Sequence, residues 1–277
     1  MSSSNTNNRG SFLQASSSSH SETPLNAGAA AFDPADTASV LPVPSGANAA
    51  VWSTLTTGTL TVNVTTEREA PNANPNAPLF LKGITHTSNP HDWESTVLPY
   101  IRRLTFMIGS TADTFFAADM LRSTHLPNLY TAITKINMTG FHWFSGISAN
   151  RASNPYLLMA ANLPSLVEIT LRFHVGGLTK SAWSERQMVA LEAADPIRAK
   201  ARKVMALEEV VNKWDLVAIF GCGNLQRVRI EYIWSDIVAH FCQPADPSAV
   251  LRGIQGWMGG EFRSRGRTVA VELVRLN

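Results

Sequence analysis

Apolar residues recur in one eight-residue pattern from residue 101 onward. Segments 101–108, 166–173 and 225–232 carry apolar residues at relative positions 1, 4, 6 and 8, and segment 133–140 matches the first three of these positions. Alternation of apolar and polar residues is typical of a strand with one buried face. The pattern therefore predicts four similar strands. Their starts are 32, 33 and 59 residues apart, so an insertion precedes the last one.

Helix-start signals lie between these strands. An Asx residue followed by proline combines an N-cap with a first helical position that needs no N–H donor. Three such pairs occur: Asn154-Pro155, Asp195-Pro196 and Asp246-Pro247. We also expect helices at 94–100, at 114–122 with Asp113 as the cap, and at 248–262, followed by a closing strand at 268–274.

The insertion, at about 179–220, is expected to be helical. Ser184 and Gln187 fit the capping-box pattern. Further on, apolar residues recur at steps of three and four, opposite a basic face. The stripe is Val204, Leu207, Val211, Trp214 and Ala218, and the basic face is Arg198, Lys200, Arg202 and Lys203. This face is interpreted as solvated, with phosphate binding as the alternative.

Repeated helix and strand units predict an α/β domain in which helices cover one face of a curved sheet. The polar residues of each strand then share the other face, which is a candidate partner-binding surface. Its members are Arg103, Thr105, Glu168, Thr170, Arg172, Arg227, Arg229 and Glu231. The alternative is that these residues form only the solvated face of an antiparallel or mixed sheet.

The N-terminal quarter of the chain has a different composition. Residues 1–50 are rich in Ser, Asn, Ala and Pro and are expected to be a disordered, low-complexity tail. Residues 51–78 are predicted to hold one strand, at 59–64, and a Pro/Asn-rich linker. The α/β domain is expected to span 79–277.

Charge and cysteine content restrict the functional class. The 23 Lys and Arg residues nearly balance the 21 Asp and Glu residues, which excludes a generally basic nucleic-acid binder. The two cysteines do not suggest a disulfide scaffold. With no apolar signal segment or membrane span in the sequence, we expect an intracellular protein, cytoplasmic or nuclear, with no membrane partner.

The strand segments resemble leucine-rich repeats in their Leu-x-x-Leu-x-Leu spacing, and Leu126-Pro127-Asn128-Leu129 and Leu163-Pro164-Ser165-Leu166 add to this resemblance. Residues 95–275 are also similar to the C-terminal part of fungal F-box-like proteins. The resemblance implies an irregular leucine-rich-repeat-like stack that recognises a protein partner. No F-box-like helix precedes residue 80, so a ubiquitin-ligase adaptor is not an expected partner.

Several residue groups can be considered for chemistry. His142 and His174 follow equivalent strands and are expected to lie on adjacent loops, as a metal or acid–base pair or as two structural histidines. A second group is Cys222, His240 and Cys242, whose cysteines are interpreted as buried thiols, with a zinc site as the alternative. A third group is interpreted as core aromatic residues, with a nucleic-acid stacking surface as the alternative. Its members are Trp183, Trp214, Trp234, Trp257 and Phe262.

No known catalytic or phosphate-loop signature occurs in the sequence. We therefore expect a non-enzymatic protein-interaction domain that has an unidentified protein partner and no cofactor. An enzyme with a site around His142 and His174 is the alternative. Nucleic acid is not an expected partner.

Overall fold

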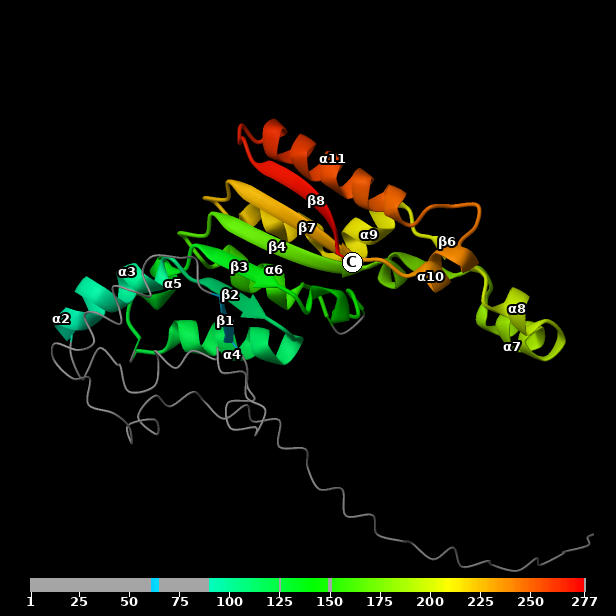
Figure 1. Ribbon diagram of the computed structural model, residues 1–277, viewed down its shortest axis with the longest axis horizontal. Helices are drawn as coiled ribbons and strands as arrows, with labels where there is room; N and C mark the ends of the chain where they lie inside the picture. Colours follow the sequence, from blue (N-terminus) through cyan, green and yellow to red (C-terminus); the bar gives the residue numbers. More distant parts are fainter. Residues whose placement is uncertain (1–60, 65–89, 125, 149–150, 277) are drawn as a thin grey trace, which may run out of the picture. The chain divides into compact units, whose positions relative to one another are not determined.

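The computed structural model describes residues 61–64, 90–124, 126–148 and 151–276 (Figure 1). The expected disordered tail at 1–50 lies outside the described residues, and so does most of the 51–78 segment. Among the described residues, no helix has the length and apolar character needed to cross a membrane.

Six strands form one sheet in which every neighbouring pair is parallel. Their order in the sheet is β1-β2-β3-β4-β7-β8, which is also their order in the chain. The α/β class is therefore confirmed. The strands are β1 Thr61–Val64, β2 Thr105–Ile108, β3 Lys135–Met138, β4 Glu168–His174, β7 Arg227–Ile233 and β8 Ala270–Leu276.

The strand expected at 59–64 is present as β1. We expect the α/β domain to begin at residue 79, but β1 is part of its sheet. All four of its residues pair with β2, from Thr61 with Thr105 to Val64 with Ile108. The pairing makes this segment the first strand of the sheet, and not part of a separate linker.

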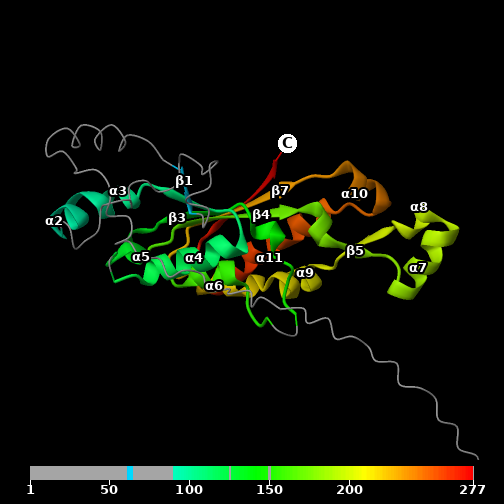
Figure 2. The ribbon, with the colours of Figure 1, turned by 90° about the horizontal axis from the view of Figure 1, so that it is seen from below.

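The main crossover helices lie on one side of the sheet. Parallel crossovers are almost always right-handed, so strands that follow one another in order place their helices on the same face. Figure 2 shows α4, α6, α9 and α11 on that side. The helical segments are α2 Pro90–Asp92, η3 Trp93–Val97, α3 Leu98–Ile101, α4 Thr111–Arg122, α5 Leu129–Ala132, η4 Phe141–Trp143, α6 Pro155–Ala161, η5 Val175–Leu178, α7 Glu185–Ala194, α8 Pro196–Ala199, α9 Leu207–Trp214, η6 Leu216–Gly221, α10 Asp236–Phe241 and α11 Ser248–Ser264.

The core lies between the sheet and these helices. Phe106, Ile136, Ile169 and Val228 form one row across four neighbouring strands, and each is at most 2% exposed. A fully buried side chain of this kind contributes about 2 kcal/mol by leaving water. The predicted alternation is confirmed, because these apolar positions are buried and the residues between them lie on the opposite face.

The register of the first copy of the pattern differs from the sequence alignment. Thr105, at position 5 of its segment, pairs with Lys135, at position 3 of the next. The later copies align as expected, with Lys135 beside Glu168 and Glu168 beside Arg227. A shift by two residues keeps every side chain on the same face, so alternation alone does not distinguish the two registers.

The helix starts follow the predicted chemistry, with two corrections. The start expected at Asp246-Pro247 is displaced by one residue, since α11 begins at Ser248 with Pro247 at the cap position. The Asn154 side chain accepts from the Tyr156 N–H at 3.0 Å, as expected for the cap before Pro155. At α4 the cap is Ser110 and not Asp113, because the Ser110 hydroxyl accepts from the Asp113 N–H at 3.1 Å and α4 begins at Thr111.

We expect the insertion at about 179–220 to be helical, but the structure shows that it also contains strands. It contains a two-stranded antiparallel sheet of β5 Thr179–Ser181 and β6 Arg202–Val204. The predicted continuous stripe is also divided, since α9 ends at Trp214, where Asp215 adopts a left-handed conformation with φ 50°. The apolar residues Val204 and Ala218 lie outside α9, in β6 and η6, so their spacing of three and four residues from the α9 stripe does not reflect one helix.

Candidate functional site: the open face of the sheet

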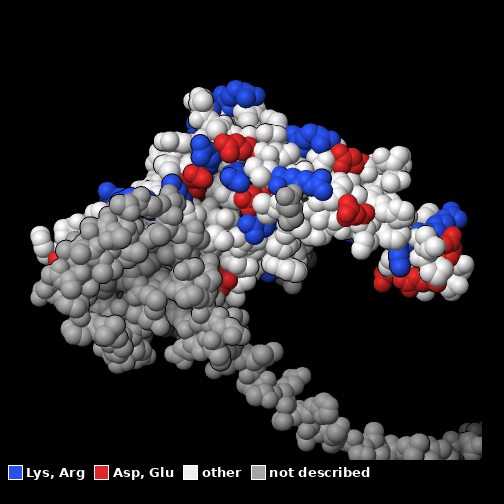
Figure 3. Space-filling view, in the orientation of Figure 1, with Lys and Arg blue, Asp and Glu red and all other residues white. Residues whose placement is uncertain are grey.

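The side of the sheet opposite the helices carries rows of polar residues, which we call the polar face. One row runs Thr105, Lys135, Glu168 and Arg227, and the next runs Asn137, Thr170, Arg229 and Glu272. Arg172 and Glu231 pair in a third row. Figure 3 shows basic and acidic side chains interleaved over this part of the molecule.

The first ion-pair group is centred on Arg227. Its guanidinium Nη1 lies 3.8 Å from Glu168 Oε2, and its Nε lies 3.3 Å from Glu272 Oε1. All three side chains are between 28% and 52% exposed. Because the side chains are partly exposed, their charges are accessible to a partner. Exposed ion pairs of this kind contribute well under about 1 kcal/mol each to stability.

The second group is centred on Glu231, whose side chain is only 8% exposed. Arg172 donates to Glu231 Oε2 from Nε at 3.1 Å and from Nη2 at 2.8 Å. On the other side, Arg229 Nε lies 3.1 Å from Glu231 Oε1. A carboxylate held between two guanidinium groups has its burial offset by charge-assisted contacts. The ion pairs of Glu231 with Arg172 and Arg229 therefore stabilise the polar face, and the two guanidinium groups also contribute to its charge.

The expected site residues occupy three kinds of position. Arg103 lies in the turn before β2, outside the paired strand residues. Over the whole residue, backbone included, Thr170 and Glu231 are each 6% exposed, too little for direct contact with a partner. The others lie on the polar face with part of their surface accessible: Thr105, Glu168, Arg172, Arg227 and Arg229.

Two charged members of the polar face were missed. Lys135 occupies position 3 of the segment 133–140, the same position as Glu168 and Arg227, so the repeat contained the signal for it. Glu272 lies between the partly buried Val271 and Leu273 of β8. The alternation within the closing strand could have located it in the same way.

His142 and His174 lie side by side, as expected, with ring centroids 6.4 Å apart. The His174 Nδ1 accepts from the Gly176 N–H at 3.0 Å, so a neutral His174 ring carries its proton on Nε2. Burial lowers the pKa of His142, and the positive charge of Arg172 acts in the same direction, while the Thr139 backbone opposes it. The pair therefore offers a donor at His174 beside a histidine that is neutral at pH 7.

The considered cysteine cluster is not assembled. Among the described residues, no group of three or more His, Cys, Asp and Glu side chains has an arrangement suited to a metal ion. Burial raises the pKa of the Cys222 thiol to about 11, although Arg267 acts in the opposite direction. Cys222 therefore behaves as the buried thiol that the sequence predicted.

The basic and aromatic groups are also separated. Arg198 stacks on Trp183 at 5.2 Å, whereas the Arg202 guanidinium donates to the Thr179 hydroxyl at 2.6 Å, so the four basic residues do not form one helix face. Trp214 and Phe262 are at most 2% exposed. The five aromatic residues therefore do not form one stacking surface.

Comparison of the chain with family models, with curated proteins and with solved structures returned no match. The functional argument therefore rests on the polar face and the histidine pair themselves.

Proposed function

We propose that this chain is a non-enzymatic protein-interaction module in which helix and strand units stack in a leucine-rich-repeat-like manner and the polar face binds a protein partner. One observation carries the proposal. The polar residues of neighbouring strands stand in register on the face opposite α4, α6, α9 and α11 (Figure 2). Such a surface is broad and is built on rigid strands, as stacked repeats provide.

The charges of the polar face favour a protein over a nucleic acid. Four basic residues, Lys135, Arg172, Arg227 and Arg229, stand among three acidic ones, Glu168, Glu231 and Glu272. Binding to a phosphate backbone requires a large excess of positive charge, whereas four basic and three acidic residues leave an excess of only one here. An interleaved surface instead complements a partner that carries both signs.

Affinity purification of the full chain from its native cell, followed by mass spectrometry, tests the proposal. The variant Lys135→Ala/Arg227→Ala removes two cations from the polar face without touching the buried Glu231 group. We expect it to lose the proteins that the unmodified chain recovers. The control Lys200→Ala/Arg263→Ala removes two exposed cations elsewhere and should retain them. Equal recovery by both variants would refute the proposed surface.

The same experiment addresses the resemblance to F-box-like proteins. The sequence before residue 80 contains no motif that resembles an F-box, and on that ground we propose that the chain does not bind a ubiquitin-ligase adaptor. Recovery of a cullin-type ligase subunit with the full chain, and its loss on deletion of residues 1–50, which leaves β1 in place, would contradict this.

A second proposal, an enzyme with an acid–base or metal site, is favoured by the 6.4 Å separation of the His142 and His174 rings. Metal analysis of the purified protein distinguishes its metal form. Stoichiometric zinc or iron that disappears in His142→Ala and in His174→Ala would support a metal site. The His174 tautomer set by Gly176 leads us to expect no such metal.

A further inference from the structure

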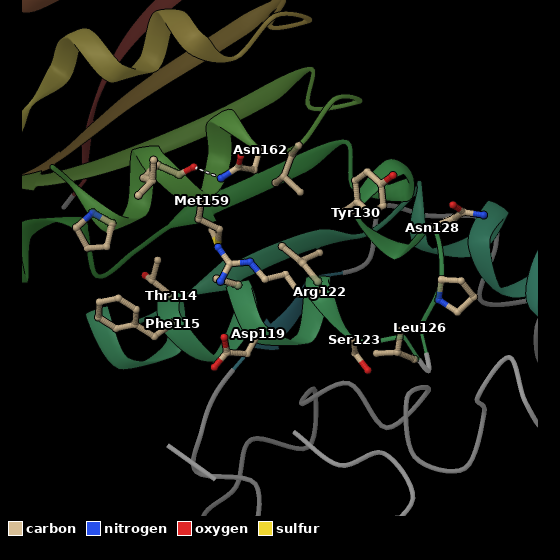
Figure 4. A pocket seen from close by; sticks show the side chains of 16 residues that line it. Thr114, Phe115, Asp119, Arg122, Ser123, Leu126, Asn128, Tyr130, Met159 and Asn162 are labelled. Carbon is tan, nitrogen blue, oxygen red and sulfur yellow. Dashed lines mark hydrogen bonds between the residues drawn. The ribbon is translucent and has the colours of Figure 1, made fainter. Parts of the chain in front are cut away.

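A groove opens on the helical side of the molecule, in the layer opposite the polar face. Its volume is about 570 Å³, and α4, α6 and the start of α5 line it (Figure 4). Neither the polar face nor the histidine pair contributes a residue to it. The groove is therefore a separate candidate site.

Apolar side chains form most of the groove and extend beyond it. Leu126 and Leu163 are buried in its wall. Three large side chains at its margin are exposed to water: Phe115 at 55%, Leu158 at 54% and Tyr130 at 42%. Single exposed apolar residues are ordinary on a protein surface, but several around one groove indicate a binding site.

One cation projects into this apolar setting. The Arg122 side chain extends from α4 across the groove toward Met159 of α6 (Figure 4). Asp119, one turn earlier on α4, also lines the groove. Within the part of the chain that the structure describes, Arg122 makes no ion pair. A carboxylate that entered the groove would therefore meet an uncompensated guanidinium group, which binds carboxylates well.

We propose that the groove binds an amphipathic helix of a partner protein, with apolar residues at i, i+3 or i+4 and i+7 and one carboxylate that pairs with Arg122. The twelve residues of α4 extend about 18 Å, enough to contact three turns of a partner helix. Phe115, Ala118 and Arg122 are spaced by three and four residues, so they form one row along α4.

The exposed margin favours a helix over a small ligand. A molecule confined to the cavity would leave much of Phe115, Leu158 and Tyr130 in water. A helix seated between α4 and α6 at the usual axial distance of about 8–10 Å covers both margins at once.

The test is a selection of displayed helical peptides against the full chain, from a library that randomises the apolar positions and one acidic position. Selected peptides are then synthesised with a fluorescent label, and their affinities are measured by anisotropy. We expect Leu158→Asp to weaken binding by about tenfold or more, because it places a charge on the apolar margin. The control Ile237→Asp, at a residue 73% exposed on α10, should bind like the unmodified chain.

A charge exchange tests the role of Arg122. Arg122→Glu should weaken peptides that carry the selected Glu by about fivefold to tenfold, and the same peptides with Lys in place of that Glu should recover the loss. Circular dichroism and thermal unfolding verify that each variant folds.

Three results would overturn the proposal. The first is that no selected peptide discriminates between the unmodified chain and Leu158→Asp. The second is that dodecanoate binds with one-to-one stoichiometry, is lost in Leu158→Asp, and no helical peptide competes with it. The third is that the chain dimerises in analytical ultracentrifugation and Leu158→Asp makes it monomeric, which would assign the groove to a second copy.

Discussion

Replacing Glu231 by Gln should destabilise the protein far more than the same change at Glu272, although both residues pair with arginine on the polar face. The Glu231 side chain is 8% exposed and lies between Arg172 and Arg229. Glu272 is 44% exposed and has one pair, with Arg227 at 3.3 Å. The comparison separates burial from the mere presence of an ion pair.

The magnitude follows from the exposure of the partners. Removing one member of a fully buried pair costs about 3–5 kcal/mol, and an exposed pair contributes about 0.2–1 kcal/mol. Because Arg172 is 25% and Arg229 is 40% exposed, water compensates part of the loss. We therefore expect about 2 kcal/mol for Glu231→Gln, against at most about 0.5 kcal/mol for Glu272→Gln.

Urea unfolding followed by tryptophan fluorescence measures both values, and thermal unfolding should show a decrease of about 4–8 °C in Tm for Glu231→Gln. A double-mutant cycle with Arg172→Gln should give a coupling free energy of about 1 kcal/mol. If Glu231→Gln and Glu272→Gln cost the same, the buried charge group does not stabilise the face and our reasoning is wrong.

Three further predictions concern the interior. Gly140→Ala should cost about 3 kcal/mol or more in unfolding free energy, because its Cβ would lie 2.0 Å from the backbone carbonyl oxygen of the turn after β2, whereas the control Gly260→Ala meets nothing within 4 Å and should be neutral or stabilising. The lowered pKa of His142 means that, below pH 6.5, the unfolded chain takes up a proton before the folded chain does, so stability should fall with pH there. Urea midpoints at pH 7.5, 6.5 and 5.5 should show a smaller decrease in His142→Gln, and an equal decrease would contradict this assignment. With a pKa raised to about 11, the Cys222 thiol in a Cys242→Ala background should react with a disulfide reagent at pH 8 only after unfolding, and rapid reaction of the native protein would show that it is accessible.

Local features of the structure were predictable because neighbouring residues produce them. The Asn154-Pro155 pair begins α6 through a local contact, since the cap needs only the side chain of Asn154 and the N–H of Tyr156. The bond from Asn154 Nδ2 to the Trp214 carbonyl, at 2.8 Å, adds a tertiary contact to this local signal. Ser110 is the instructive exception. Ser110 and Asp113 are both good caps, and the choice between them depends on where the chain leaves β2 at Ile108.

Alternation within each strand likewise determined, from the sequence alone, which residues face the helices and which form the polar face. Which residues of adjacent strands pair with each other was decided by the tertiary structure. Alternation has a period of two, so a shift of two residues leaves both faces unchanged, and only packing placed Thr105 beside Lys135.

Burial and pairing also depended on the assembled sheet. Glu231 looks like any other outward charge in the sequence, and it is buried because Arg172 and Arg229 approach it from two strand positions. The groove between α4 and α6 has the same origin, since it combines Arg122 and Leu158 from separate helices. The sequence by itself determined which faces are apolar and polar, because that depends on neighbours along the chain. The tertiary structure decided which residues meet across them, because contacts between distant segments depend on how whole elements pack.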